Sequence, residues 1–115
     1  MSYAADLHIH SRFARGTSKN LTLPNLARWA RTKGIDLMAT GDFTQPVWRD
    51  EIRSALRDRG DGLFELDGTL FVLGTEVNCN AEQGGRNRRV YLLVLAPSFK
   101  TVDGITAAVS SIGKL

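Results

Sequence analysis

The segment Asp6-Leu7-His8-Ile9-His10 contains both histidines of the 115-residue chain, two positions apart. Side chains of an extended strand alternate between its two faces, so the two imidazoles point to one side and Leu7 and Ile9 to the other. Two imidazoles on one face can bind one divalent cation or two adjacent ones. The alternative is an edge strand whose histidines meet water or a carbonyl. We predict a buried strand over residues 3–9 that ends at this histidine pair.

A helix and a second strand follow the histidine pair. Residues 11–20 lack apolar periodicity and predict a loop. Thr22 as N-cap, Pro24 in the first turn and Gly34 after a basic last turn predict a helix between them. Residues 35–40 form a second apolar run, which Gly41 and Asp42 close. This order of strand, helix and strand is a βαβ unit and predicts a parallel sheet.

The middle of the chain predicts a second helix and a hairpin. The helix begins after Pro46, carries an apolar stripe and ends at Gly60 and Gly62. Asp67-Gly68 lies between apolar runs at 64–66 and 69–75. These two residues predict a tight hairpin turn, because both central positions of such a turn need positive φ. The strand at 69–75 would deliver Glu76 at its end.

The last third of the chain predicts a strand and a helix. The polar stretch 80–88 predicts a loop or a long hairpin tip, and the apolar run 90–96 predicts a central strand. A final helix, capped by Thr101 or Asp103, would end near Gly113. The order of elements predicts an α/β fold of one domain over residues 1–115. A closed eight-unit barrel needs about 250 residues, so the chain would form roughly half of one, with an open sheet edge that invites a homo-oligomer.

Composition and charge narrow the class of protein. The net charge is +3, and residues 1–33 hold six basic residues against one acid, which favours a polyanionic partner such as nucleic acid. Taken alone this is weak evidence, because basic residues usually just solvate a surface. No apolar run approaches the roughly 18 residues that span a membrane, so we expect no membrane partner. The single cysteine, Cys79, excludes an internal disulfide and suits a cytoplasmic location.

Four potential metal ligands fall at three successive strand ends. The first strand ends at His8 and His10, the second at Asp42 and the third at Glu76. Sites in α/β sheets form at the carboxyl ends of parallel strands, so we expect these side chains to meet. Two nitrogens and two carboxylates form a ligand set that suits zinc, manganese or iron.

Cationic and aromatic side chains surround the same strand ends. Cations there would hold an anionic substrate while metals polarise a phosphoryl oxygen, although each cation alone is as well explained by a solvated surface. Aromatic rings could stack on a base. The predicted substrate-binding cations are Arg12, Arg15, Lys19, Arg86, Arg88 and Arg89. The candidate stacking residues are Phe13, Phe43 and Trp48, although the place of Trp48 in a helical stripe favours a core position.

Four segments in order resemble the PHP (polymerase and histidinol phosphatase) family of metal-dependent phosphoesterases, and most closely its endonuclease Q branch. They are residues 6–11, residues 26–44, Gly74-Thr75-Glu76-Val77 and Leu95-Ala96-Pro97-Ser98. The resemblance implies a distorted (β/α)7 TIM-like barrel, of which this chain would be the N-terminal half. It also implies two or three metals, and cleavage of DNA at deaminated bases such as uracil and hypoxanthine.

The resemblance also assigns site residues. The paired histidines of the family fall on His8 and His10, Asp42 falls where many members have a histidine, and Glu76 falls on a bridging glutamate. We therefore predict that these four residues are both catalytic and metal-binding. Two positions depart from the pattern, because Gln45 and Tyr91 stand where the branch has histidine.

The sequence favours a metal-dependent phosphoesterase that is part of a DNA endonuclease and is incomplete, with weak or no activity alone. The resemblance implies a site with about eight or nine metal ligands, and this chain supplies four of them. We therefore expect the chain to hold at most one metal ion, loosely. Two alternatives remain at this point. One is a small-molecule phosphatase of the same family, and the other is a degenerate, non-catalytic module for binding or assembly.

Overall fold

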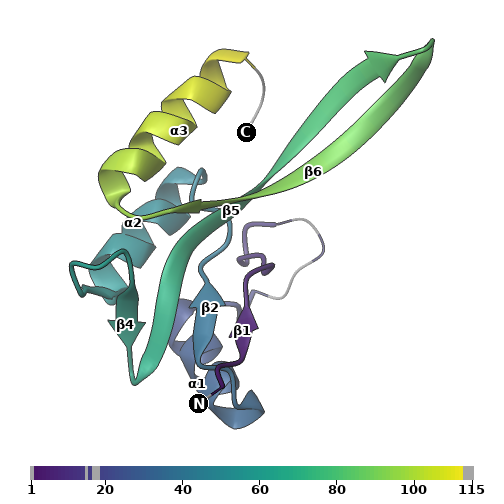
Figure 1. Cartoon of the computed structure of the whole chain (residues 1–115). Helices are drawn as coiled ribbons and strands as arrows, with labels where there is room; N and C mark the ends of the chain where they lie inside the picture. Colours follow the sequence, from purple (N-terminus) through teal and green to yellow (C-terminus); the bar gives the residue numbers. More distant parts are fainter. Residues whose placement is uncertain (1, 15, 17–18, 113–115) are drawn as a thin grey trace.

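Three parallel strands form the centre of the fold (Figure 1). β1 (Ala5–Asp6) pairs with β2 (Leu37–Ala39), and β2 pairs with the first part of β5 (Thr69–Gln83). β4 (Phe64–Leu66) and β3 (Arg57–Asp58) continue the sheet in antiparallel sense, in the order β1-β2-β5-β4-β3. The computed structural model describes residues 2–14, 16 and 19–112. The predicted α/β class and the parallel βαβ unit are confirmed.

Helix α1 (Leu23–Lys33) has the ends that the sequence predicts. The Thr22 hydroxyl oxygen accepts a hydrogen bond from the Asn25 N–H at 3.4 Å, and Pro24 lies in the first turn. At the other end, the Gly34 N–H donates to the carbonyls of Ala30 and Arg31. These contacts satisfy backbone groups that a helix leaves unpaired at its ends.

Helix α2 (Pro46–Ala55) ends earlier than the sequence predicts. Gln45 caps it, since the side-chain oxygen accepts a hydrogen bond from the Trp48 N–H at 2.7 Å. After Ala55 the chain becomes extended at Leu56, and residues 57–58 pair with β4. The predicted end at Gly60 and Gly62 is wrong, because residues 57–58 lie before both glycines and form a strand with β4 instead of continuing the helix.

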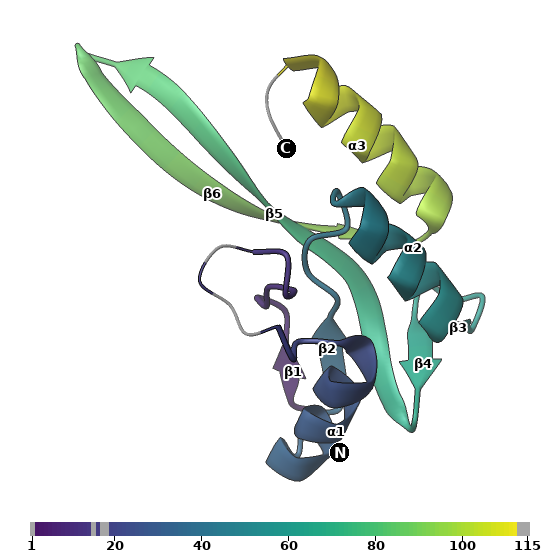
Figure 2. The ribbon, with the colours of Figure 1, turned by 180° about the vertical axis from the view of Figure 1, so that it is seen from behind.

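The hydrophobic core lies between one face of the sheet and the helices. Met38, Phe71 and Phe64 are neighbours across β2, β5 and β4, and all three are buried. Helices α1 and α2 cover this face, as the two opposite views show (Figures 1 and 2). Trp48 and Ile52 of α2 are fully buried against it. Burial of each such side chain contributes about 1.5–3 kcal/mol, so this packing fixes α2 against the strands.

The first strand differs from the prediction in length and burial. β1 has two residues, and the flanking Tyr3 and Leu7 are exposed. β1 is the edge strand of the sheet, and none of the described elements covers its outer side. The prediction of a buried strand over 3–9 is therefore wrong, although the segment does lie parallel to β2.

A long two-stranded ribbon extends from the sheet (Figure 1). β5 runs for 15 residues, and β6 (Arg86–Ala96) pairs with it from Leu73↔Ala96 to Gln83↔Arg86. Residues 80–88 are thus mostly strand around a Gly84-Gly85 turn, which confirms the long hairpin and corrects the loop. The predicted central strand at 90–96 is wrong, because β6 pairs with β5 alone.

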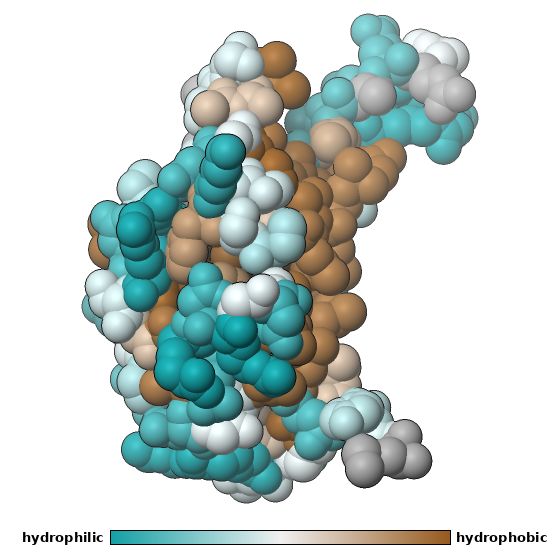
Figure 3. Space-filling view, turned by 60° about the vertical axis from the view of Figure 1, so that its left-hand side comes forward, coloured by the Kyte–Doolittle hydropathy of each residue, from teal (hydrophilic) through white to brown (hydrophobic). Residues whose placement is uncertain are grey.

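The ribbon elongates the molecule and exposes apolar surface. The radius of gyration is 15.0 Å, against about 13 Å expected for a compact domain of this length. Half-exposed apolar side chains of β6 include Val90, Leu92, Leu93 and Leu95. Figure 3 shows a hydrophobic band along the right-hand side of the view, which continues onto the base of the ribbon, and a mostly hydrophilic outer end of the ribbon.

Helix α3 (Phe99–Ile112) begins before the predicted caps. The Ser98 hydroxyl accepts a hydrogen bond from the Thr101 N–H at 3.3 Å, so Ser98 takes the role that the sequence assigned to Thr101 or Asp103. The predicted end near Gly113 lies outside the described residues. Among the helices of the described ranges, none has the length and apolar content needed to cross a membrane. The described strands form an open sheet and do not close into a barrel.

Candidate metal centre

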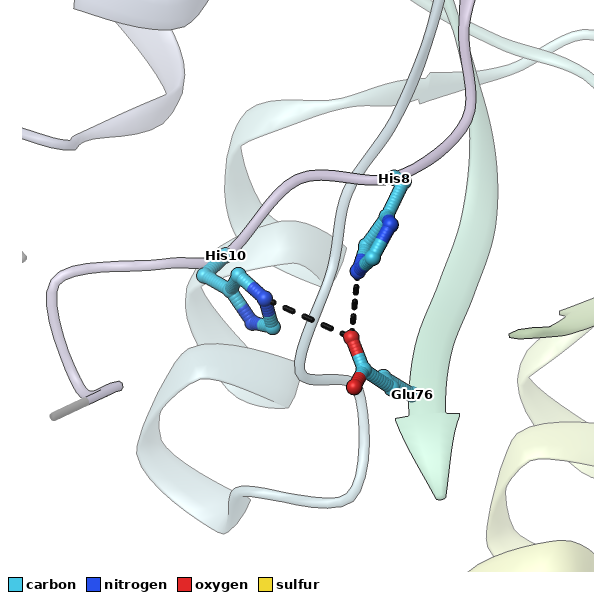
Figure 4. A group of neighbouring side chains, drawn as sticks. All are labelled: His8, His10 and Glu76. Atoms are coloured by element: carbon cyan, nitrogen blue, oxygen red, sulfur yellow. Dashed lines mark hydrogen bonds and ion pairs between the residues drawn. The ribbon is translucent and has the colours of Figure 1, made fainter. Parts of the chain in front are cut away.

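Three of the four predicted ligands meet at the carboxyl ends of the parallel strands (Figure 4). His8 and His10 follow β1, and Glu76 lies on β5. One ligand atom from each residue lies within 4.8 Å of the others. The Glu76 Oε2 atom contacts the His8 Nε2 atom and is 3.4 Å from the His10 Nε2 atom. The two imidazoles therefore do share a side, as their spacing predicts.

Glu76 is the sheltered member of the cluster. Its side chain is 15% exposed, against 55% for His8 and 40% for His10. The residue does not end its strand, as the sequence suggests, because β5 continues to Gln83 and Glu76 pairs with Leu93 of β6. Pairing within the continuous strand β5 fixes the backbone that carries the Glu76 carboxylate. The more exposed histidines leave the other side of the cluster open to solvent.

The backbone of the histidine segment is fixed by two contacts. An Asp6 carboxylate oxygen accepts a hydrogen bond from the His8 N–H at 3.2 Å. Gly41, at φ 68°, packs so closely against this segment that an added Cβ would overlap the Ile9 carbonyl oxygen and lie 3.3 Å from the His10 Cα. Only glycine allows both the left-handed backbone and this approach. Gly41 therefore sets how near the histidines lie to the end of β2.

Asp42 supports the histidine segment and lies outside the three-residue cluster. Its Oδ2 atom accepts hydrogen bonds from the Ser11 N–H at 2.7 Å and from the Ser11 hydroxyl at 2.6 Å. Its Oδ1 atom is 3.6 Å from the His10 Nδ1 atom, while the His10 Nε2 atom faces Glu76. Metal-bound histidines commonly present their second nitrogen to a carboxylate in this way, which fixes the ring orientation.

Ser11 is a site-supporting residue that the sequence analysis missed. It is fully buried, and it holds the turn after His10 against Asp42 through both of its donors. The available signal was a serine directly after the histidine pair, ahead of a loop without apolar periodicity. A serine in that place can bond a neighbouring backbone or carboxylate and so stabilise a turn.

A buried hydrogen-bond network connects the ends of β2 and β5. The Thr40 hydroxyl oxygen accepts a hydrogen bond from the Gly74 N–H at 3.1 Å. The Trp48 indole N–H donates to the carbonyls of Thr40 and Gly41, at 3.2 and 2.9 Å. Because buried polar groups are costly when unpaired, this network restrains the Gly41–Asp42 turn relative to the strand that carries Glu76.

The donor set fits a divalent metal ion. Two imidazole nitrogens and one carboxylate oxygen are the ligands of catalytic zinc sites and of mononuclear iron sites, which keep further positions open for water or substrate. The exposure of His8 and His10 leaves room for such positions. The predicted metal site thus has three convergent ligands among the described residues, and the role of Asp42 as a direct ligand stays a prediction.

The predicted substrate-binding residues of the N-terminal loop are dispersed. The Arg12 guanidinium forms a two-pronged ion pair with Glu51 of α2 and lies 4.4 Å from the Phe13 ring centre. This hydrogen-bonded pairing lowers the pKa of the Glu51 carboxyl below its ordinary value of 4.5. Lys19 is exposed, and Arg15 lies outside the described residues.

The other predicted residues have different environments. Trp48 is buried in the core, which confirms the position that its helical stripe favours. Phe43 is also buried, so the prediction that it could stack on a base is wrong, whereas Phe13 is partly exposed. Arg86 and Arg88 lie on the exposed outer half of β6. Of the two residues that depart from the family pattern, Gln45 caps α2 and Tyr91 lies exposed on β6.

The chain is similar to parts of longer proteins. No protein-family model matches the chain. An uncharacterized protein of Methanocaldococcus jannaschii is 37% identical over 98 residues, which are 85% of this chain and 10% of that protein. The crystal structure of the lesion-specific endonuclease PfuEndoQ from Pyrococcus furiosus matches with a TM-score of 0.82 at 33% identity, over 97% of this chain and 26% of that one.

A second solved structure agrees with the first. It is Endonuclease Q in complex with a 27-mer duplex substrate that has an abasic lesion at the active site. It matches with a TM-score of 0.81 at 34% identity, over 96% of this chain and 26% of that chain. The chain therefore spans about a quarter of the endonuclease structures, and nearly all of it has the mixed α/β fold of that part of Endonuclease Q.

Proposed function

We propose that this chain contributes a metal-binding part of a DNA endonuclease that hydrolyses a phosphodiester bond at damaged nucleotides. The observation that carries the proposal is the convergence of His8 and His10 on the Glu76 carboxylate at the ends of parallel strands. The similarity to a lesion-specific endonuclease over 97% of the chain supports the choice of DNA as substrate. Membership of the PHP family, and a sheet that is part of a larger barrel, belong to the same proposal.

In this proposal each residue of the site has a distinct task. His8, His10 and Glu76 would hold a divalent ion such as zinc, manganese or iron, and Asp42 would orient the His10 ring through its Nδ1 side. Such an ion, when bound, would polarise a phosphoryl oxygen and lower the pKa of water enough to supply a nucleophile near neutral pH. Ser11 restrains Asp42 and so acts on His10 only indirectly.

The number of ligands limits what the chain does alone. Three convergent ligands among the described residues suffice for one ion, and the resemblance implies two or three. A single ion held by two exposed histidines exchanges readily with solvent. We therefore expect the 115-residue chain to cleave DNA weakly or not at all in isolation, and its metal affinity is the more direct readout.

One observation favours a second candidate, a non-catalytic binding or assembly module. Gln45 and Tyr91 replace expected histidines, and Gln45 is engaged in capping α2 rather than free to bind a metal. A module that had lost its chemistry would bind DNA without a metal ion. It would also tolerate loss of the histidine pair.

Metal titration of matched variants tests the proposal. Isothermal titration with Zn²⁺ and Mn²⁺ should find one ion per chain in the wild type and at least tenfold weaker binding in Glu76→Gln and in His8→Ala/His10→Ala. Glu82→Gln is the control, because Glu82 lies exposed on the same strand and outside the cluster. Equal affinity in all four proteins would refute the metal centre. A wild-type chain that binds a 27-mer abasic duplex but takes up neither Zn²⁺ nor Mn²⁺ would favour the second candidate.

A further inference from the structure

The two faces of the β5–β6 ribbon differ in composition. In an antiparallel pair, directly opposite residues share a face, and the faces alternate along each strand. One face begins at Glu76, which is opposite Leu93, and continues outward through the pairs Asn78–Tyr91 and Asn80–Arg89. We call these six residues the Glu76 face. It changes from apolar to polar and cationic along β6 with increasing distance from the metal-binding cluster.

The opposite face has a different character. It begins with the pairs Val77–Leu92 and Cys79–Val90, so its inner part is apolar. Arg88 and Arg86 follow on the same face toward the tip, because they alternate with Arg89 along β6. The three arginines that lie close together in the sequence are thus divided, with one on the face of Glu76 and two behind it.

Side-chain contacts agree with this division. The Arg89 Nε–H donates to the Asn80 side-chain oxygen at 3.4 Å, as expected for opposite residues on one face. A hollow of about 420 Å³ is lined by Asn80, Asn87 and Arg89 and also by Arg88, although Arg88 belongs to the opposite face of the ribbon. The Arg89 guanidinium and two amide groups supply several hydrogen-bond donors there, which suit the oxygens of a phosphate group.

The spacing along the Glu76 face matches a nucleic-acid strand. From Glu76 to the Asn80–Arg89 pair is four residues of β5, or about 13 Å at the usual rise of a strand. The backbone of one DNA strand advances about 3.4 Å per nucleotide along the helix axis and also winds around that axis, so phosphates about 13 Å apart in space are about two nucleotides apart. Tyr91 lies between the two points, is 56% exposed and offers a flat ring to a sugar or base. Glu82, opposite Asn87, brings a negative charge one pair beyond Arg89 and sets the outer limit.

We propose that the Glu76 face is a binding track for one strand of DNA, in which Arg89 and Asn80 hold a phosphate about two nucleotides from the phosphate at the metal-binding cluster. The proposal rests on the proposed function, and it adds the direction in which the substrate leaves the site. It also distinguishes Arg89 from Arg86 and Arg88, which sequence position alone groups together.

Binding of DNA in the absence of metal tests the track separately from the metal centre. The probe is a fluorescein-labelled 27-mer duplex with a central abasic site, measured by fluorescence anisotropy in EDTA at several salt concentrations. Arg89→Ala should weaken binding about fivefold and reduce the slope of log K against log salt by about 0.9, the value for one phosphate contact. Arg86→Ala is the matched control, with the same loss of charge on the opposite face. Arg86→Ala should leave the affinity for the duplex within twofold of the wild-type value and should leave the salt slope nearly unchanged.

The length of the DNA provides a second readout. A duplex that ends directly beyond the abasic site on the side that reaches the ribbon no longer extends to Arg89, so Arg89→Ala should bind it as well as the wild type does. Both sides are shortened in turn, since only one of them reaches the ribbon. Equal losses in Arg86→Ala and Arg89→Ala, or no measurable wild-type binding at 50 mM salt, would overturn the track. Because this binding is measured in EDTA, it does not depend on whether the three-residue cluster holds a metal ion, so the two proposals fail independently.

Discussion

The close packing of Gly41 against the histidine segment makes Gly41→Ala the sharpest test of how the fold positions the site. Alanine at φ 68° has left-handed strain of about 1–2 kcal/mol. The added Cβ would also overlap the Ile9 carbonyl oxygen, and relief of such overpacking typically costs about 1–3 kcal/mol. We expect a total loss of about 2–5 kcal/mol in the free energy of unfolding. Because the relief must move Ile9 and His10, metal affinity should also fall at least tenfold.

A second glycine separates the strain from the overlap. Gly34 has a similar φ of 74°, and an added Cβ there would meet no described atom within 4 Å. Gly34→Ala should therefore lose only the strain of about 1–2 kcal/mol and keep its metal affinity. Urea unfolding followed by far-UV circular dichroism measures the stability of both variants, and competition with a zinc-binding dye measures the affinity. Equal losses of stability in the two variants, with zinc affinity intact in Gly41→Ala, would refute the role of Gly41.

Three further predictions follow from the site and its supports. After dialysis, metal analysis should find at most one ion per chain, and two or more tightly held ions would contradict the three-ligand centre. Arg12 lowers the pKa of Glu51, so their pairing stabilises the fold above about pH 4.5 and this stabilisation is lost as the pH falls further. The stability difference between wild type and Glu51→Gln should thus shrink from pH 6 to pH 3 in urea titrations, and a constant difference would argue against the pairing. Trp48→Phe removes the donor for two buried carbonyls and should cost about 1–3 kcal/mol, whereas Trp29→Phe, at an exposed position, should cost little in the same assay.

Features that depend on local signals were predicted well from the sequence. Thr22 and Gly34 set the ends of α1 through contacts within a few residues, and Asp67-Gly68 set a hairpin in the same way. The alternation of His8 and His10 placed both rings on one side, and the end of the parallel strand placed them near Glu76. These features depend on the backbone conformation of a few neighbouring residues, and the types of those residues are enough to predict it.

Features that depend on distant partners were predicted less well. Residues 90–96 are apolar enough for a central strand, yet β6 pairs only with β5, and nothing in its own sequence reveals that. The end of α2 was missed because pairing of residues 57–58 with β4 outweighs the helical pattern. Asp42 was expected as a ligand, and its hydrogen bonds with the distant Ser11, which bonds one of its oxygens, could not be read from the sequence.

The half-exposed apolar side chains of β6 affect how the folded protein should be handled. Apolar surface is exposed to water in the native state at Val90, Leu92 and Leu93, and Tyr91 and Leu95 extend it. Reporter dyes that brighten on such surfaces should fluoresce strongly before any heating, so a dye-based melting curve would begin from a high baseline. Fluorescence of the fully buried Trp48 indole reports the loss of the core itself, and mild detergent or arginine in the buffer should limit self-association during purification.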